Sequence, residues 1–257
     1  MGFRYLNQIA TQEHLQEFLE LSDLAIGAPD SASNVFLLSH RLRDSAPMRL
    51  CERILKRDPA SAALIEQRRL VAPYDAEALK RLPKGSLGHT YATVLEAMGY
   101  DINFYPDTTF YNGLESDADY INYRVFATHD IHHIITGFSL DNYGETGVIS
   151  LSVGQFNHPG LAFTDLIGLL LGWLSSETPL DELKDSDQIS DHAEYLFDMI
   201  NRGIAMGVRA KLLFPVLWEE RMEQDLEALR EELGIEALRE GPCSWITDPR
   251  IQAALNR

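Results

Sequence analysis

Four residues in one short stretch have the types and the spacing of metal ligands. The segment HDIHHIITGFSLDNYGE contains His129, Asp130, His133 and, twelve residues after the second histidine, Glu145. On a helix that turns about 100° per residue, the two histidines point only about 40° apart and Asp130 lies about 60° from His133. Two imidazoles four positions apart have the spacing with which HExxH helices hold zinc. These side chains could therefore converge on one ion.

Glu145 can reach the same ion only if the chain turns back after His133. An unbroken helix would place Glu145 about 18 Å along the axis from His133, too far for a shared ion. The intervening segment is rich in residues that favour turns, namely Gly137, Asp141, Asn142 and Gly144. We therefore expect one helix that carries the two histidines, a reversal, and a second helix that begins close to Glu145.

A site of two histidines and two carboxylates indicates a class of metal. Mixed imidazole and carboxylate ligands suit zinc, manganese, iron or cobalt better than calcium or magnesium. We expect a divalent transition metal in a catalytic site because the ligands leave coordination positions open. The alternative is that the His-Asp pair is a surface ion pair or a structural histidine. His132, beside the ligand pair, is either a packing residue or a proton donor.

The rest of the sequence predicts the helices that would hold this site. Apolar residues recur at spacings of three and four, the period of an amphipathic helix. Proline favours the first helical position and glycine the residue after the last, so Pro59 and Gly99 mark helix ends. The predicted helices lie within 15–24, 50–55, 59–70, 74–80, 86–98, 119–138, 161–174, 192–214 and 218–233, the last capped by Gly234. We expect an all-α fold, a helical bundle that forms a single domain over residues 1–257.

Two segments depart from the helical period. Residues 100–120 mix Asp, Asn, Gly and Pro with aromatic residues, so we expect an aromatic-rich loop with room for a short strand pair. Residues 177–191 are acidic and typical of a linker. The run from Asn157 to Gly160 should interrupt the chain just before the most apolar helix.

Composition excludes several classes of function. The 257 residues include 39 acidic and 22 basic ones, a net charge of −17, so we expect no nucleic-acid partner, because phosphate binding depends on lysine and arginine. No stretch has the roughly 18 apolar residues of a membrane span, and the opening MGFRYLNQIATQEH resembles neither a signal nor a transit peptide. Cys51 and Cys243 form no disulfide framework. We expect a cytoplasmic protein.

The positive charges are concentrated in one region. Residues 41–84 hold eleven of the 22 basic residues and only six acidic ones. Their exposed face could dock on an anionic membrane surface, since each cation near such a surface contributes about 1 kcal/mol. The candidates are Arg49, Arg53, Lys56 and Arg57. The alternative is a solvated helix face with neighbouring ion pairs.

Three separated segments resemble one family. The run His129-Asp130-x-x-His133 followed by eleven residues and Glu145 is similar to the signature of the Coq-four family of ubiquinone-biosynthesis proteins. Upstream, LPKGSLGHTY at 82–91 resembles that family's Leu-Pro-x-Gly-[ST]-Leu-Gly-x-x-Tyr segment. Downstream, the helix around Arg202 and Gly207, the Trp218 region and the closing LREELGI also agree, so that the resemblance covers about residues 30–235.

The resemblance implies an all-helical fold and a metal, commonly zinc, at His129, Asp130, His133 and Glu145. It also implies action on a polyprenylated 4-hydroxybenzoate-type precursor, with removal of the ring carboxyl at C1. Partners would be other quinone-biosynthesis proteins at a peripheral membrane surface, and a homo-oligomer is left open. Eukaryotic members carry a transit peptide, so this sequence resembles a bacterial member at the inner face of the cytoplasmic membrane, acting in ubiquinone or a related prenylquinone pathway.

Decarboxylation of an aromatic ring has two chemical requirements. Loss of CO₂ from an aromatic carboxylate leaves charge on the ring, which a Lewis acid bound at the carboxylate or ring hydroxyl would stabilise. A proton must replace CO₂ at C1, and His132 is our candidate donor.

A prenyl tail would need an apolar trough, and one segment offers it. Between Leu161 and Leu174 the apolar side chains are interrupted by glycines and by Asp165, a carboxylate that needs a partner or water. We expect the tail to contact Leu166, Ile167 and Leu170, and an anionic headgroup to contact Arg202. Ordinary core packing, and ion pairs with the acidic linker, are the alternatives.

Two other functions fit parts of the pattern. HD-type metal-dependent phosphohydrolases also use an adjacent His-Asp pair, for which His89 and Asp191 could supply the remaining ligands, but the spacing of His133 and Glu145 would then be unexplained. A non-catalytic prenyl-lipid-binding scaffold of a quinone-biosynthesis complex is the other alternative.

Overall fold

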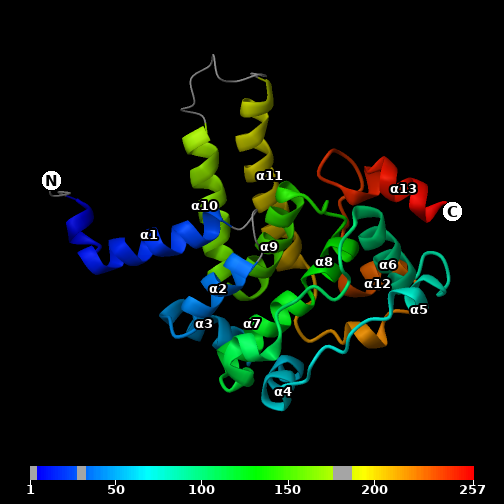
Figure 1. Ribbon diagram of the computed structural model, residues 1–257, viewed down its shortest axis with the longest axis horizontal. Helices are drawn as coiled ribbons and strands as arrows, with labels where there is room; N and C mark the ends of the chain where they lie inside the picture. Colours follow the sequence, from blue (N-terminus) through cyan, green and yellow to red (C-terminus); the bar gives the residue numbers. More distant parts are fainter. Residues whose placement is uncertain (1–4, 28–32, 176–186) are drawn as a thin grey trace.

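Helices α9 and α11 pack along each other in the most extensive helix contact of the described residues, which form an all-helical fold as predicted (Figure 1). The structure is a computed structural model that describes residues 5–27, 33–175 and 187–257, with side chains for these ranges except 173–175 and 187–194. The α-helices are α1 (Gln12–Ile26), α2 (Ser33–Arg41), α3 (Ala46–Leu55), α4 (Pro59–Gln67), α5 (Ala76–Lys80), α6 (Leu87–Met98), α7 (Asp117–Ala127), α8 (His129–Thr136), α9 (Asn142–Phe156), α10 (Pro159–Ser175), α11 (Asp187–Arg209), α12 (Leu226–Leu233) and α13 (Pro249–Leu255). The 3₁₀ turns are η1 (Leu6–Gln8), η2 (Thr108–Leu114), η3 (Trp218–Glu220) and η4 (Trp245–Thr247).

The helix ends follow the residues that mark them in the sequence. The side chain of Ser86 accepts a hydrogen bond from the His89 backbone N–H at the start of α6, and Gly99 ends that helix in the left-handed conformation. Gly234 ends α12 in the same way. Asn157 ends α9, and α10 begins at Pro159, so the predicted interruption at 157–160 is confirmed.

Three predicted helices have different bounds in the structure. The predicted helix 119–138 is two helices, α7 and α8, because Thr128 leaves helical geometry and its hydroxyl donates to the Arg124 carbonyl. The predicted helix 218–233 is η3 followed by α12, since the carbonyls of Met222 and Gln224 accept hydrogen bonds from the first turn of α6 instead. The predicted helix 192–214 is α11, which ends at Arg209, well before Pro215.

The structure also differs in part from the prediction for the two segments that we expected to lie outside helices. Residues 100–120 form η2 and the start of α7, and the part of this segment that the structure describes contains no strand. Of the predicted acidic linker 177–191, residues 187–191 belong to α11, whereas 177–186 lie outside the described residues.

The packing of α9 against α11 depends on glycine. A Cβ on Gly203 would clash with the Gly147 carbonyl, and a Cβ on Gly207 would clash with the Leu151 carbonyl. The two backbones therefore approach more closely than larger residues would allow. This contact fixes the position of α9, whose first turn carries Glu145.

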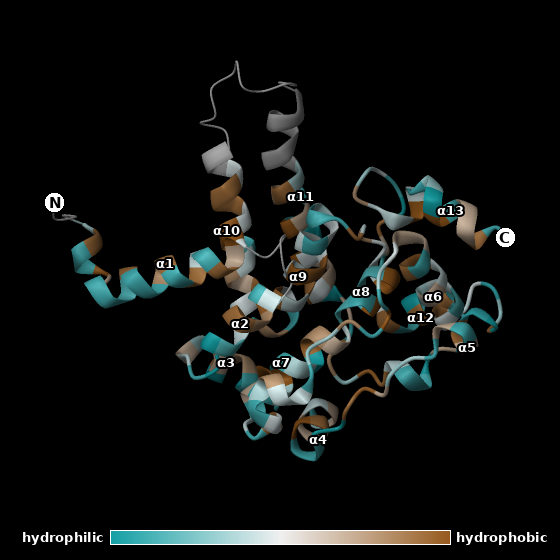
Figure 2. Cartoon of the chain, viewed as in Figure 1, coloured by the Kyte–Doolittle hydropathy of each residue, from teal (hydrophilic) through white to brown (hydrophobic). Residues whose placement is uncertain are grey.

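The second part of α10 and the first part of α11 extend side by side away from the other helices (Figure 1). Most of α10 is apolar (Figure 2). Among the described residues, no helix is both long enough and apolar enough to cross a membrane.

Candidate metal centre

The predicted reversal between the histidines and Glu145 is present. Helix α8 begins at His129 and ends at Gly137, which has a φ of +83°. Asp141 then caps α9 by accepting hydrogen bonds from the Tyr143 and Gly144 backbone N–H groups at 3.0 Å. Gly144 is needed here because a Cβ would clash with the Ser139 backbone. Glu145 therefore lies in the first turn of α9 and faces α8.

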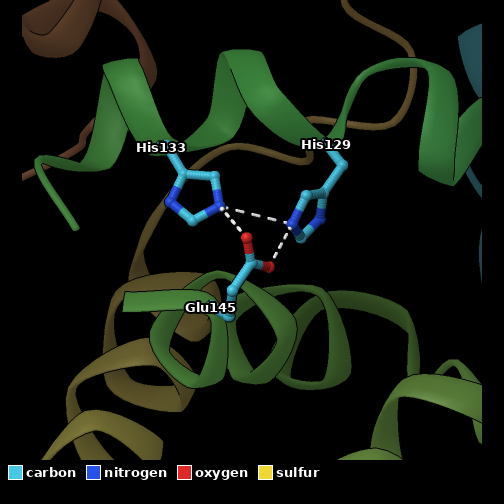
Figure 3. Close-up of side chains that lie close together, drawn as sticks. All are labelled: His129, His133 and Glu145. Carbon is cyan, nitrogen blue, oxygen red and sulfur yellow. Dashed lines mark hydrogen bonds and ion pairs between the residues drawn. The ribbon is translucent and has the colours of Figure 1, made fainter. Parts of the chain in front are cut away.

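Three of the four predicted ligands meet at one point (Figure 3). His129 Nε2 lies 2.7 Å from Glu145 Oε2, and His133 Nε2 lies 3.2 Å from Glu145 Oε1. The two Nε2 atoms are 3.3 Å apart. All three ligand atoms lie within 4.8 Å of one another. Two imidazole nitrogens and one carboxylate form a donor set that catalytic zinc sites use, with a position left for substrate or water.

A further hydrogen bond sets the orientation of the His133 ring. Its Nδ1 donates to the Phe138 carbonyl at 3.3 Å, so Nε2 is the nitrogen that faces the ligand group. This is the arrangement with which proteins commonly fix the tautomer of a ligating histidine.

The site is buried on one side and open on the other. The exposed fraction of the side chain is 1% for His133, 15% for His129 and 41% for Glu145. Burial raises the pKa of Glu145, but the charges of the two imidazoles outweigh this effect and hold the pKa well below its usual range. Burial lowers the pKa of His133, and Glu145, together with Asp130 and the Phe138 carbonyl, more than offsets it, so this pKa is raised. The group thus favours a positive charge beside its carboxylate, which a metal cation would supply.

Comparison with known proteins identifies the family. A family model described as "Coenzyme Q (ubiquinone) biosynthesis protein Coq4" matches residues 7–239. The chain belongs to the Coq4 family. The resemblance seen in the sequence is therefore confirmed.

Relatives of this Coq4 chain include fungal proteins of ubiquinone biosynthesis. It is 28% identical over 228 residues to "Ubiquinone biosynthesis protein COQ4, mitochondrial" of Clavispora lusitaniae, covering 86% of this chain and 66% of that protein. It is 31% identical to the protein of the same name from Yarrowia lipolytica, over 73% of this chain and 66% of that one. The chain thus spans just under two thirds of the length of these relatives.

A solved structure shares the fold. The crystal structure of a candidate ubiquinone biosynthesis protein from Nostoc punctiforme PCC 73102 superposes with a TM-score of 0.69 at 25% sequence identity. The match covers 87% of this Coq4 chain and 97% of the Nostoc chain.

The other predicted residues of the motif lie beside the group. Asp130 is not among the three residues that meet. Burial raises its pKa, and the charges of His129 and His133 oppose that rise. His132 packs edge-on against Trp218 with ring centroids 5.8 Å apart. Burial, followed by the charges of the other two histidines, lowers the pKa of His132 to about 3.

The residues predicted to bind substrate are divided between two places in this Coq4 chain. Ile167 is buried against Leu21 and Leu38, Leu170 packs beside it, and Leu166 is half exposed on α10. Arg202 instead lies on α11, where it forms a 2.7 Å ion pair with Asp198. Arg202 lines a cavity of about 950 Å³ between α11 and residues 236–243, and no described side chain of α10 lines it.

Asp165 has the partner that the sequence requires but does not identify. It accepts a hydrogen bond of 2.8 Å from the Ser150 hydroxyl of α9, while its Oδ1 is buried without a partner among the described residues. Burial raises the pKa of Asp165 to about 7.

Of the two further ligands suggested by an HD-type phosphohydrolase, His89 lies outside the ligand group. It donates from Nδ1 to the Lys80 carbonyl at 2.9 Å. The side chain of Asp191 lies outside the described residues. The spacing of His133 and Glu145, which that alternative left unexplained, is explained by the three-residue group.

Sequence reasoning missed the residues that hold α8 in place. Arg230 and Trp245 are buried, and both donate side-chain hydrogen bonds to backbone carbonyls of α8. Trp245 lies beyond the segments that carry the family resemblance, and no spacing in the sequence links either residue to the histidines.

Proposed function

We propose that this protein is a metal-dependent decarboxylase of ubiquinone or related prenylquinone biosynthesis. It would remove the C1 carboxyl of a polyprenylated 4-hydroxybenzoate-type precursor, with a proton replacing CO₂ at C1. Membership of the Coq4 family and the names of its relatives support the pathway. The observation that carries a catalytic role is the convergence of His129, His133 and Glu145 on one point with an open side.

The buried and the exposed ligands of the site would have different roles. His133, buried and held through Nδ1, would fix the position of the ion, whereas the exposed edges of His129 and Glu145 face the side from which substrate can approach. When bound, a divalent transition metal such as Zn²⁺ would supply Lewis-acid stabilisation of the charge that develops as CO₂ leaves. Asp130, which follows His129 in the first turn of α8, is the proposed fourth ligand, as the family resemblance implies.

His132 is the proposed proton donor, and the structure defines how it would have to act. With its pKa lowered to about 3 it is a neutral ring at pH 7, so it would pass on a proton only after receiving one. Its Nε2 is buried without a partner among the described residues. A His132→Ala variant with undiminished turnover would remove it from this role.

The remaining substrate contacts are also proposals. Leu166, Ile167 and Leu170 would contact the prenyl tail, and Arg202 an anionic part of the substrate. Docking of residues 41–84 on an anionic membrane would bring the protein to its lipid substrate and to other quinone-biosynthesis proteins. Arg49, Arg53 and Arg57 are exposed, as such docking requires.

The first test is elemental analysis of the purified protein beside a His133→Ala variant. We expect near-stoichiometric transition metal in the wild type and its loss in the variant. Release of labelled CO₂ from carboxyl-labelled prenylated hydroxybenzoates would then follow the metal content. A folded wild type that cannot be loaded with metal would contradict the catalytic function.

A non-catalytic prenyl-lipid scaffold is the second candidate. The observation in its favour is that large apolar side chains are exposed on neighbouring helices, with Leu166 at 50% on α10 and Phe197 at 62% on α11. Prenyl-lipid binding without turnover, unchanged in His133→Ala, would favour the scaffold.

A further inference from the structure

The backbone of His133 is held by a tryptophan near the C-terminus. The Trp245 indole N–H donates to the His133 carbonyl at 2.8 Å, and the indole is buried, with 4% exposed. A buried donor that lost this acceptor would leave a polar group unsatisfied, so the contact restrains both residues. Trp245 also lies outside residues 7–239, the range that the family model matches.

The same segment holds the group that orients the His133 ring. Residues 137–139 pair with residues 243–245 through two backbone hydrogen bonds, of 2.8 and 3.1 Å, around an antiparallel bridge. Phe138 is at the centre of this pairing, and its carbonyl accepts the hydrogen bond from His133 Nδ1. Residues 243–245 therefore fix the His133 carbonyl directly and the acceptor of its imidazole indirectly.

Arg230 completes the contact at the end of α8. Its Nε donates to the Ile135 carbonyl at 2.9 Å and its Nη2 to the Ile134 carbonyl at 2.8 Å. These carbonyls lie in the last turn of a helix, where intrahelical partners are lacking and a cation is favourable. The guanidinium lies over the Trp245 ring, 5.9 Å from its centroid.

We propose that Trp245 is a positioning residue for the metal centre. It holds His133 in the orientation in which Nε2 meets His129 and Glu145, so its hydrogen bond raises metal affinity as well as stability. This inference rests on the proposed metal-binding function. Groups that orient a ligating side chain typically change metal affinity by about 10- to 100-fold.

The test is the Trp245→Phe variant, which keeps an aromatic ring beside Arg230 but lacks the N–H donor. Zn²⁺ affinity is measured by competition with a chelator, and the geometry of the site by the visible absorption of the Co²⁺-loaded protein. We expect affinity to fall about 10- to 100-fold and the Co²⁺ spectrum to change. Lower thermal stability with wild-type affinity and an unchanged spectrum would show a merely structural role and overturn the proposal.

Trp218→Phe is the matched control. Trp218 is fully buried, and its indole N–H has no partner among the described residues. Removing that N–H should leave Zn²⁺ affinity unchanged. An equal loss of affinity in both variants would show that any buried tryptophan matters, and would overturn the specific role of Trp245.

Two further measurements distinguish failure of the metal-binding function from failure of the role proposed for Trp245. A wild type that binds no Zn²⁺, or a His133→Ala variant that binds it as tightly, would overturn the metal centre itself and the role of Trp245 with it. If Trp245→Phe does not fold, the indole N–H resonance of Trp245 is followed by NMR in the wild type during Zn²⁺ titration. A shift that saturates with the metal supports the proposal, and an unmoved resonance overturns it.

Discussion

Glu145 sets the charge balance of the metal centre at the scale of single residues. Its carboxylate contacts both imidazoles, one through each oxygen. Because His133 is buried, its pKa would be lowered by desolvation alone, and the ionised Glu145 makes the largest contribution to raising it, followed by Asp130 and the Phe138 carbonyl. The carboxylate therefore contributes charge to the site as well as a ligand atom.

Replacing Glu145 with Gln should change both the pKa of His133 and the affinity of the site for Zn²⁺. In the metal-free protein we expect the pKa of His133 to fall, because burial would then be opposed only by Asp130 and the Phe138 carbonyl. Zn²⁺ affinity should fall by at least about 10-fold, since a charged ligand is lost. Imidazole titration by NMR and chelator competition measure the two effects. Glu240→Gln, an exposed change, is the control, and an unchanged His133 titration would contradict the prediction.

Asp165 makes stability depend on pH. Its pKa rises from 3.8 to about 7 in the folded protein, so the folded state binds a proton more tightly than the unfolded state does. The contribution of Asp165 to the free energy of unfolding is therefore fully present below about pH 3.8 and is lost as the pH rises through 7. Asp165→Asn should stabilise the protein at pH 8, by an upper limit of about 4 kcal/mol, and should have little effect at pH 4.

Urea denaturation of both proteins at pH 4, 6 and 8 measures this difference. Ser150→Ala is the companion variant, because it removes the one hydrogen bond that lowers the pKa of Asp165. It should increase the loss of stability at pH 8. A gain in Asp165→Asn that is the same at all three values would contradict the linkage to ionisation.

At the scale of helices, the sequence predicts best what depends on local signals. The reversal before Glu145 follows from glycine and Asp-Asn turn residues, and α6 follows from Ser86 and Gly99. The break at Thr128 has no such signal, because the same apolar period continues through α7 and α8. Likewise η3 and α12 separate because Met222 bonds to α6, a contact that is distant in the sequence.

The candidate site shows the same division. Helical spacing brings His129 and His133 together, and the reversal delivers Glu145. Asp130 satisfies the same helical projection but is not part of the group that meets, since an angular projection says nothing about where the opposing helix lies. The contacts of Trp245 with α8 depend on tertiary folding alone, so sequence spacing could not reveal them.

The glycine contact between α9 and α11 gives a prediction at this scale. Gly207→Ala would place a methyl group against the Leu151 carbonyl. Backbone must then move, and overpacking of this kind costs about 1–3 kcal/mol. Because α9 carries Glu145, Zn²⁺ affinity should fall as well. Urea denaturation and chelator competition measure the two effects.

Gly168→Ala on α10 is the matched control. A Cβ there meets nothing within 4 Å, so alanine should stabilise the helix by about 0.5–1 kcal/mol. Destabilisation of equal size at both positions would show that the close contact between α9 and α11 is not the cause of the loss of stability in Gly207→Ala.

The whole molecule carries its charge unevenly. The net charge is −17, although residues 41–84 carry an excess of basic residues. Lys56 bonds to Asp117, so one of the four predicted docking cations takes part in an internal ion pair. Arg49, Arg53 and Arg57 are exposed around α3, and these three are the residues with which a membrane surface would have to interact.

This surface predicts salt-dependent binding to anionic vesicles. With each cation contributing about 1 kcal/mol, replacing Arg49, Arg53 and Arg57 together with Gln should weaken binding about 100-fold. Co-sedimentation with phosphatidylglycerol-containing vesicles at low and moderate salt measures it. Electrostatic binding should also fall in the wild type as salt rises, because screening shortens the reach of the charges.

The control must change net charge equally, because a protein of net charge −17 is repelled by an anionic surface as a whole. Arg209, Arg250 and Arg257 are exposed and lie outside 41–84, so the triple Gln variant at these positions adds the same negative charge elsewhere. If binding depends on the local surface, this variant should keep most of its affinity while the α3 variant loses it. Equal losses would mean that net charge decides binding, and the basic residues of α3 would then be a solvated helix face.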